Sequence, residues 1–148
     1  MAGFVGEYIC KLDDRGRLIF PAEFRAQASS FAGSCYVVRK NLYDISLEVY
    51  QLEEWEKLAE QVKSRINILS REGNRVWEEF NRGRALVEPD EKMGRILIPK
   101  TLLEKINVQK EVVFFGLGFK IQIWAKEEWD KRGMSDEEAG ELFEKLLG

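Results

Sequence analysis

The chain has 148 residues, 45% of them hydrophobic and 33% charged, with a formal net charge of -3. This composition is typical of a globular protein and excludes an intrinsically disordered chain. Histidine is absent, which excludes Ser-His-Asp and Cys-His catalysis and zinc sites of the HExxH type. No apolar run approaches the roughly 20 residues that span a bilayer, and the first seven residues lack the basic and apolar regions of a signal peptide. We therefore expect a cytoplasmic protein that is not an enzyme and that has no membrane partner, metal site, cofactor or small-molecule substrate.

The negative charge is concentrated at the C-terminal end of the chain. Residues 126–148 contain eight acidic and four basic side chains, so the preceding residues are close to electrically balanced. Because nucleic-acid binding depends on where basic groups gather, the net charge alone does not exclude a DNA partner.

The chain contains one sequence unit twice. Residues 16–21 read Gly-Arg-Leu-Ile-Phe-Pro, and residues 94–99 read Gly-Arg-Ile-Leu-Ile-Pro. A second match links the Glu-Glu-Trp segment at residues 53–55 with the same three residues at 127–129. Since the features keep their order, we interpret the chain as an internal duplication. We therefore expect a fold built from two copies of one structural unit.

The residue pattern of each unit predicts the same series of elements. In the first unit, alternation and turn residues predict a strand at residues 7–12, a turn at 13–16 and a strand at 17–20. A helix from Pro21 at residues 21–28 follows, and then strands at 35–39 and 46–51. In the second unit they predict a strand at residues 85–88, a turn at 90–94, a strand at 95–98, a helix from Pro99, and strands at 111–115 and 120–125.

Helices are predicted between and after the two units. Apolar residues at helical spacing begin at Trp55 and continue to Phe80, with Gly73 as a candidate break. At the C-terminal end, Ser135 and Glu138 form a capping-box pattern. The apolar stripe of this last helix consists of Leu142, Phe143, Leu146 and Leu147.

Each repeated turn carries basic residues that suit contact with DNA. The tip of a tight turn lies in solvent, and arginine can grip a phosphate or read guanine in the major groove, which a two-stranded ribbon is narrow enough to enter. We expect a carboxylate before each turn to orient its arginine. The candidate DNA-binding residues are Arg15, Arg17, Arg25, Lys92 and Arg95, and the candidate orienting carboxylates are Asp13 and Glu91.

Other interpretations of these turns remain open. Arg17 and Arg95 can be solvated charges or internal partners of nearby carboxylates, which for a single turn is the commoner case. A hydrolase using Asp13 and Glu23 as an acid–base pair is a weaker alternative, since turn carboxylates are usually only solvated. Retention of the arginine in both copies favours a binding role, because folding requires the glycine of the turn but not the arginine after it.

Residues 12–25 resemble the first signature of the MraZ family. The second copy and the Glu-Glu-Trp segments extend this resemblance over nearly the whole chain. The motif of this family, an aspartate followed after three residues by an arginine, falls on Asp13 and Arg17, and its second copy on Glu91 and Arg95.

The resemblance implies a fold and an organisation. The expected fold is mostly β with α: duplicated AbrB-like halves interlocked in a double-split β-barrel with surrounding helices. The corresponding division of the chain is a first AbrB-like unit at residues 6–54, linking helices at 55–82, a second AbrB-like unit at 83–126 and an acidic helical tail at 127–148.

The resemblance also implies a function. It predicts a ring-shaped homo-oligomer, associated with the nucleoid, that binds short direct repeats of double-stranded promoter DNA. The expected role is a sequence-specific transcriptional regulator that represses the division and cell-wall gene cluster, including its own promoter. The alternative is an antitoxin-like or other protein-binding module of the same barrel class, in which the turns are structural.

Two departures from the motif affect the second copy. Glu91 is longer than aspartate and would hold Arg95 less tightly, and Leu103 stands where the first copy has Arg25. We therefore expect the first turn to contribute more to DNA binding than the second.

Overall fold

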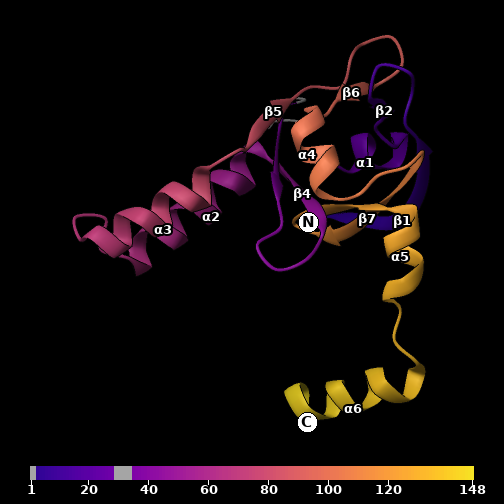
Figure 1. The fold of residues 1–148 in the computed structure, drawn as a ribbon. Helices are drawn as coiled ribbons and strands as arrows, with labels where there is room; N and C mark the ends of the chain where they lie inside the picture. Colours follow the sequence, from indigo (N-terminus) through magenta and orange to yellow (C-terminus); the bar gives the residue numbers. More distant parts are fainter. Residues whose placement is uncertain (1–2, 29–34) are drawn as a thin grey trace.

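The computed structural model describes residues 3–28 and 35–148 and confirms the repeated order of elements (Figure 1). The first unit consists of β1 (Phe4–Lys11), β2 (Arg17–Ile19), α1 (Ala22–Gln27), β3 (Tyr36–Lys40) and β4 (Ser46–Gln51). The second unit repeats this series as β5 (Ala85–Val87), β6 (Arg95–Leu97), α4 (Lys100–Lys105), β7 (Glu111–Gly118) and β8 (Ile121–Ala125). As expected, sheets form the centre of the molecule and helices lie around them.

The strands of the two units are interleaved in space. Within the described residues, a six-stranded antiparallel sheet has the order β1-β7-β8-β4-β3-β5, and β2 pairs with β6 in a separate two-stranded ribbon. Exchanging each strand for its counterpart in the other unit leaves this order unchanged. Three of the five pairings in the large sheet, and the only pairing in the ribbon, join one unit to the other. Each unit is therefore completed by the other.

Strands β3 and β4 are buried on both faces. Tyr36, Val38, Leu47 and Val49 face the main core, which also contains β2, β6 and the helices α1 and α4. The intervening residues Val37 and Tyr50 face a smaller cluster with Trp55 and Phe80. This second cluster attaches the linking helices to the sheet.

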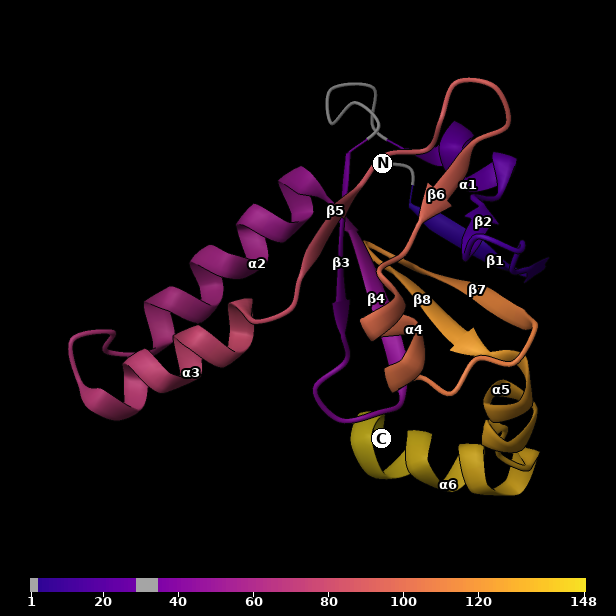
Figure 2. The same cartoon turned by 45° about the horizontal axis from the view of Figure 1, so that its top comes forward.

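The linking helices form a hairpin that projects from the body of the molecule (Figure 2). They are α2 (Leu52–Arg65) and α3 (Arg71–Asn81), and Ser70 caps α3 by accepting a hydrogen bond from the Gly73 N–H at 3.0 Å. The expected break at Gly73 is wrong, because this residue lies inside α3. A Cβ atom there would lie 1.9 Å from the Asn67 carbonyl oxygen, so the glycine permits the close passage of the chain between the helices.

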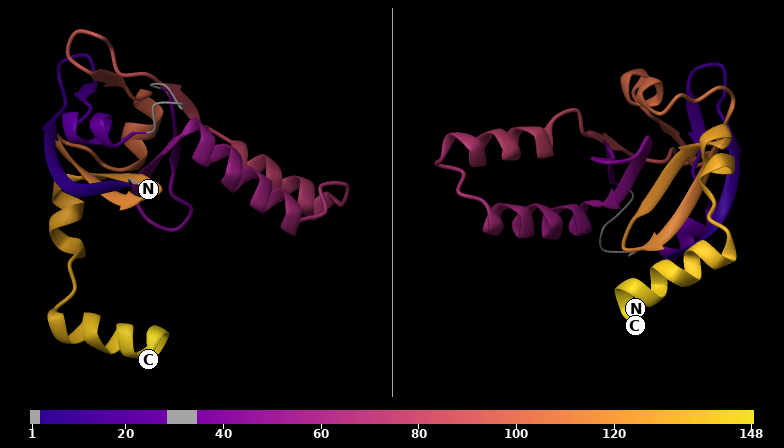
Figure 3. Two further views of the ribbon diagram at one scale, coloured as in Figure 1. Left: turned by 180° about the vertical axis from the view of Figure 1, so that it is seen from behind. Right: turned by 60° about the horizontal axis from the view of Figure 1, so that its bottom comes forward.

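The chain ends in two helices, α5 (Lys126–Arg132) and α6 (Asp136–Leu147). Helix α5 packs on the sheet through Trp129, whose ring lies 4.8 Å from that of Phe115. The predicted capping box of α6 is confirmed, with Ser135 and Glu138 bonded reciprocally. Helix α6 stands away from the sheets (Figure 3). None of the helices in the described ranges combines the length and apolar character needed to pass through a membrane.

Candidate nucleic-acid interface

In the first turn, one carboxylate organises both the backbone and the arginine. Asp13 Oδ1 accepts hydrogen bonds from the backbone N–H groups of Arg15 and Arg17 at 2.9 and 2.8 Å. Its Oδ2 accepts one from Arg17 Nε at 2.8 Å. Gly16 closes the turn with a φ of 79°, a conformation that glycine adopts without steric cost. Within the described residues, the two Nη groups of Arg17 form no hydrogen bond, so they are the donors that remain for a partner.

The second turn contains the same arrangement built by a different residue. Asp90 Oδ1 accepts from the backbone N–H groups of Met93, Gly94 and Arg95, at 2.8, 3.0 and 3.3 Å, and its Oδ2 accepts from Arg95 Nε at 2.6 Å. The assignment of Glu91 as the orienting carboxylate is therefore wrong, and Glu91 is exposed. The second turn is one residue longer than the first between aspartate and arginine, so a gapless alignment on the glycines selects the neighbour of the correct residue.

The β2–β6 ribbon places both arginines on one face. Its register pairs Arg17 with Leu97 and Ile19 with Arg95, so these four side chains share the outward face. The alternate residues Leu18 and Ile96 are buried at 0% and 1% exposure. Arg17 and Arg95 are diagonal neighbours, about 7–8 Å apart at Cα, which corresponds to roughly two base-pair steps of about 3.4 Å each. Their side chains are 28% and 26% exposed.

Hydrogen bonding keeps both orienting carboxylates ionised. The backbone N–H of Arg17 is the main cause of a pKa of Asp13 below its usual value. The pKa of Asp90 lies well below its usual value, mainly because of the backbone N–H of Met93 and next because of the Arg95 side chain. Because the ionised form accepts these bonds, both turns are held in one geometry at neutral pH.

The two units support each other's turns. The guanidinium of Arg25, on α1 of the first unit, lies against Gly94 of the second turn, and the Leu103 side chain of α4 approaches Gly16 of the first turn. Arg25 therefore adds a basic group beside the second turn, not the first. Both reasons for expecting the first turn to dominate are thereby removed, since Asp90 anchors Arg95 and Arg25 lies beside it.

The other predicted residues lie at the tips. Arg15 and Lys92 are exposed in the first and second turn. Sequence reasoning missed Asp90, Ile19 and Leu97; the apolar pair is 45% and 61% exposed between the arginines. The signal for Asp90 was the Pro-Asp start of the turn, and the signal for the apolar pair was strand alternation, which places them on the face of the arginines.

The fold and this site define a class of protein: two interleaved copies of one unit, each presenting an arginine anchored by an aspartate on a shared ribbon. The chain matches the family described as "MraZ protein, putative antitoxin-like" over residues 4–75 and 80–143, and it belongs to the MraZ family.

Curated relatives of similar length support this assignment. The chain is 32% identical over 147 residues to "Transcriptional regulator MraZ" of Bacteroides thetaiotaomicron, covering 99% of this chain and 94% of the relative. It is 35% identical over 131 residues to the protein of that name from Caldanaerobacter subterraneus subsp. tengcongensis, covering 88% and 87%. It is 34% identical over 146 residues to that of Thermoanaerobacter pseudethanolicus, covering 96% and 97%.

Proposed function

We propose that this protein is a sequence-specific DNA-binding transcriptional regulator whose contact surface is the outward face of the β2–β6 ribbon. The observation that carries the proposal is the duplicated Asp–Arg pair: Asp13 with Arg17, and Asp90 with Arg95. In each pair, the carboxylate accepts a hydrogen bond from Nε, and within the described residues neither Nη group forms a hydrogen bond. A guanidinium held in this way loses little conformational entropy on binding.

The chemistry of the face suits a base-pair edge. Arginine Nη donors can bond to guanine O6 and N7 or to a phosphate, and apolar side chains such as Ile19 and Leu97 can contact a thymine methyl group. Arg15 and Lys92 are exposed at the tips of the turns, and the exposed Arg25 lies beside the second turn, so we propose that these three residues contact phosphates. We therefore assign base contacts to Arg17 and Arg95 and backbone contacts to the other three.

We further propose that the protein acts as a ring-shaped homo-oligomer that represses the division and cell-wall gene cluster, including its own promoter. One ribbon offers few contacts, each worth about 1–3 kcal/mol. A ring can present several ribbons to short direct repeats, and the high effective concentration after the first contact then raises the overall affinity. The unchanged strand order on exchange of the two units supports the double-split barrel, and nucleoid association follows from DNA binding in the cytoplasm.

The direct test is fluorescence anisotropy with a labelled fragment of the DNA upstream of this protein's gene. Arg17→Ala and Arg95→Ala should each weaken binding by about 5- to 150-fold, the equivalent of one base contact of 1–3 kcal/mol. The double substitution Arg65→Ala with Arg71→Ala is a matched control, because it removes two exposed positive charges far from the ribbon. It should leave affinity within about twofold, since long-range screened charge contributes little at physiological salt.

The same experiment separates the rival function. A wild-type protein that does not bind the fragment even at low salt would contradict DNA binding and favour an antitoxin-like protein-binding module. Equal affinity of wild type and the Arg17→Ala, Arg95→Ala double variant would contradict the assignment of the ribbon.

A further inference from the structure

Helix α6 exposes an apolar stripe that nothing in the described part of the chain covers. Leu142, Phe143, Leu146 and Leu147 are 38%, 66%, 69% and 82% exposed. Each residue of α6 except Ala139 belongs to the exposed class. Four large apolar side chains on one helix face, next to an acidic face, are typical of a helix that completes its packing against another surface.

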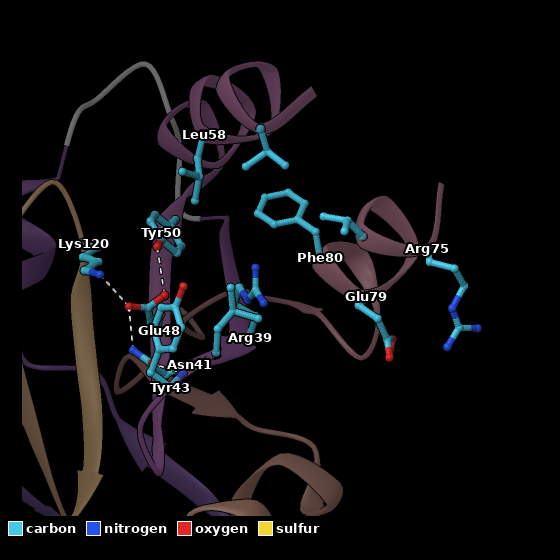
Figure 4. A pocket seen from close by; sticks show the side chains of 13 residues that line it. Arg39, Asn41, Tyr43, Glu48, Tyr50, Leu58, Arg75, Glu79, Phe80 and Lys120 are labelled. Atoms are coloured by element: carbon cyan, nitrogen blue, oxygen red, sulfur yellow. Dashed lines mark hydrogen bonds and ion pairs between the residues drawn. The ribbon is translucent and has the colours of Figure 1, made fainter. Parts of the chain in front are cut away.

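The chain also contains a groove without an occupant among the described residues. It lies between the α2–α3 hairpin and the loop from β3 to β4, and its volume is about 550 Å³ (Figure 4). Its walls include the apolar residues Leu58, Val62, Val76 and Phe80. Tyr43 and Leu42 at the rim are 92% and 63% exposed, and Val76 is 51% exposed.

The floor of the groove is polar and includes a buried arginine. Glu48 accepts hydrogen bonds from Asn41, Tyr50 and Lys120, which satisfies its carboxylate within the chain (Figure 4). Arg39 is only 5% exposed, and its guanidinium lies 5.0 Å from the centre of the Phe80 ring. Within the described residues its single hydrogen bond runs from Nε to the Lys40 carbonyl. The Nη groups of Arg39 are thus directed to no acceptor of the described chain.

The groove and the helix have complementary shape and charge. The helix is convex with an apolar stripe, and the groove is concave with apolar walls. Arg39, Arg75 and Lys120 line the groove, against Glu48 and Glu79. Helix α6 carries one basic residue and five acidic ones, Asp136, Glu137, Glu138, Glu141 and Glu144. This opposition favours the acidic helix over a basic partner.

We propose that α6 of one copy of this chain docks by its apolar stripe in the α2–α3 groove of the next copy. This inference rests on the proposed ring assembly and names its joint. Because helix and groove are different surfaces, the contact is heterologous, and heterologous contacts form closed rings when the rotation closes. Helix α6 of each subunit then lies in the contact between subunits. This contact is formed by surfaces other than the ribbon that carries Arg17 and Arg95.

Two full-length variants test the joint from its two sides. The helix variant carries Phe143→Asp and Leu146→Asp, and the groove variant carries Tyr43→Asp and Val76→Asp; all four residues are exposed, so folding is retained and is checked by thermal unfolding. Sizing with light scattering should give a ring for wild type and a monomer for each variant. Lys145→Gln, which changes an exposed residue of α6 outside both the apolar stripe and the acidic set, is the control and should remain a ring.

Mixing decides the geometry of the joint. The groove of the helix variant and the helix of the groove variant are both intact, so an equimolar mixture should form a heterodimer of twice the monomer mass and nothing larger. A mixture that stays monomeric would overturn the proposal in favour of α6 binding its own chain. A helix variant that keeps the ring, a groove variant that keeps it, or a monomeric wild type would overturn it as well.

Failure of this joint and failure of the proposed function give different results. If the ring persists in both variants while Arg17→Ala still weakens DNA binding, only the joint is wrong. If sizing and mixing behave as expected while Arg17→Ala and Arg95→Ala leave DNA binding unchanged, only the DNA-binding surface is wrong.

Discussion

The guanidinium group of Arg25 lies against Gly94, although the two residues belong to different copies of the repeated unit. A Cβ atom on Gly94 would come within 2.6 Å of Arg25 Cζ. The contact joins helix α1 of the first unit to the turn of the second unit. Pairing of β2 with β6 joins the strands that follow the two turns. The two turns are therefore parts of one surface, and a change in one unit is transmitted to the other.

Alanine at Gly94 should move Arg25, whereas alanine at Gly16 should not. Both glycines have a positive φ, 73° and 79°, so each substitution should cost about 1–2 kcal/mol of unfolding free energy. Only Gly94→Ala adds a collision with the Arg25 guanidinium, which must swing away. The NMR signal of Arg25 Nε should therefore shift in Gly94→Ala and stay in place in Gly16→Ala; an unchanged signal in both variants would contradict the contact.

Asp90 and Glu91 should differ sharply on substitution. Asp90→Asn removes the charge that holds Arg95 Nε and weakens the acceptor of three backbone N–H groups. DNA affinity should fall roughly twofold to fivefold, as expected for a partly exposed ion pair. Glu91→Gln, its exposed neighbour, should leave anisotropy titrations unchanged. A larger loss for Glu91→Gln than for Asp90→Asn would restore the alignment-based assignment.

Acid should loosen both turns. Since the folded-state pKa values of Asp13 and Asp90 lie below their ordinary values, the stability that these groups contribute is complete above the unfolded pKa of about 4 and is lost as the pH falls below it. The double variant Asp13→Asn, Asp90→Asn should consequently show a shallower decline of melting temperature between about pH 5 and pH 2 than wild type. Parallel curves for the two proteins would contradict the lowered pKa values.

Arg17→Lys should separate affinity from discrimination. Lysine keeps the positive charge but lacks the planar fork that forms two hydrogen bonds with guanine. Binding to non-specific DNA should stay close to wild type, while preference for the direct-repeat fragment over scrambled DNA should fall by about 5- to 150-fold. Competition titrations measure both quantities, and an unchanged preference would place Arg17 on a phosphate instead of a base.

The α2–α3 hairpin should depend on Gly73. Its Cβ would collide with the Asn67 backbone carbonyl, which cannot move without opening the link between the helices. Gly73→Ala should lower the free energy of unfolding by about 1–3 kcal/mol, the usual cost of overpacking. Gly140→Ala, at a helical glycine with open space around it, should instead favour its helix by up to about 1 kcal/mol. Equal effects in denaturant titrations would show that Asn67 does not restrict residue 73.

The duplication, the element order and the positions of Arg17 and Arg95 could be predicted from the sequence, because strand alternation, turn glycines and helix-starting prolines are local signals. Asp90 was missed, because a gapless alignment of the two copies on their glycines selects Glu91, and the Pro-Asp start of the turn does not by itself say which carboxylate holds Arg95. The contact of Arg25 with Gly94 could not be predicted from the sequence either. It depends on pairing between strands β2 and β6, which are distant along the chain.

The apolar stripe of α6 illustrates the same division. Its residues and its capping box follow from helical periodicity, and the structure confirms the helix and the box. That the stripe would be left uncovered depends on where the chain leads α6 relative to the sheets, which periodicity does not encode.

Contact of the ribbon face with DNA is tested most directly by site-specific photocrosslinking. A benzophenone side chain at Leu97, exposed between Arg17 and Arg95, should crosslink to the upstream fragment, and the crosslink should disappear in the Arg17→Ala, Arg95→Ala background. The same group at Leu86, an exposed residue of β5, should give no protein–DNA product. Crosslinking from Leu86 but not from Leu97 would contradict the account.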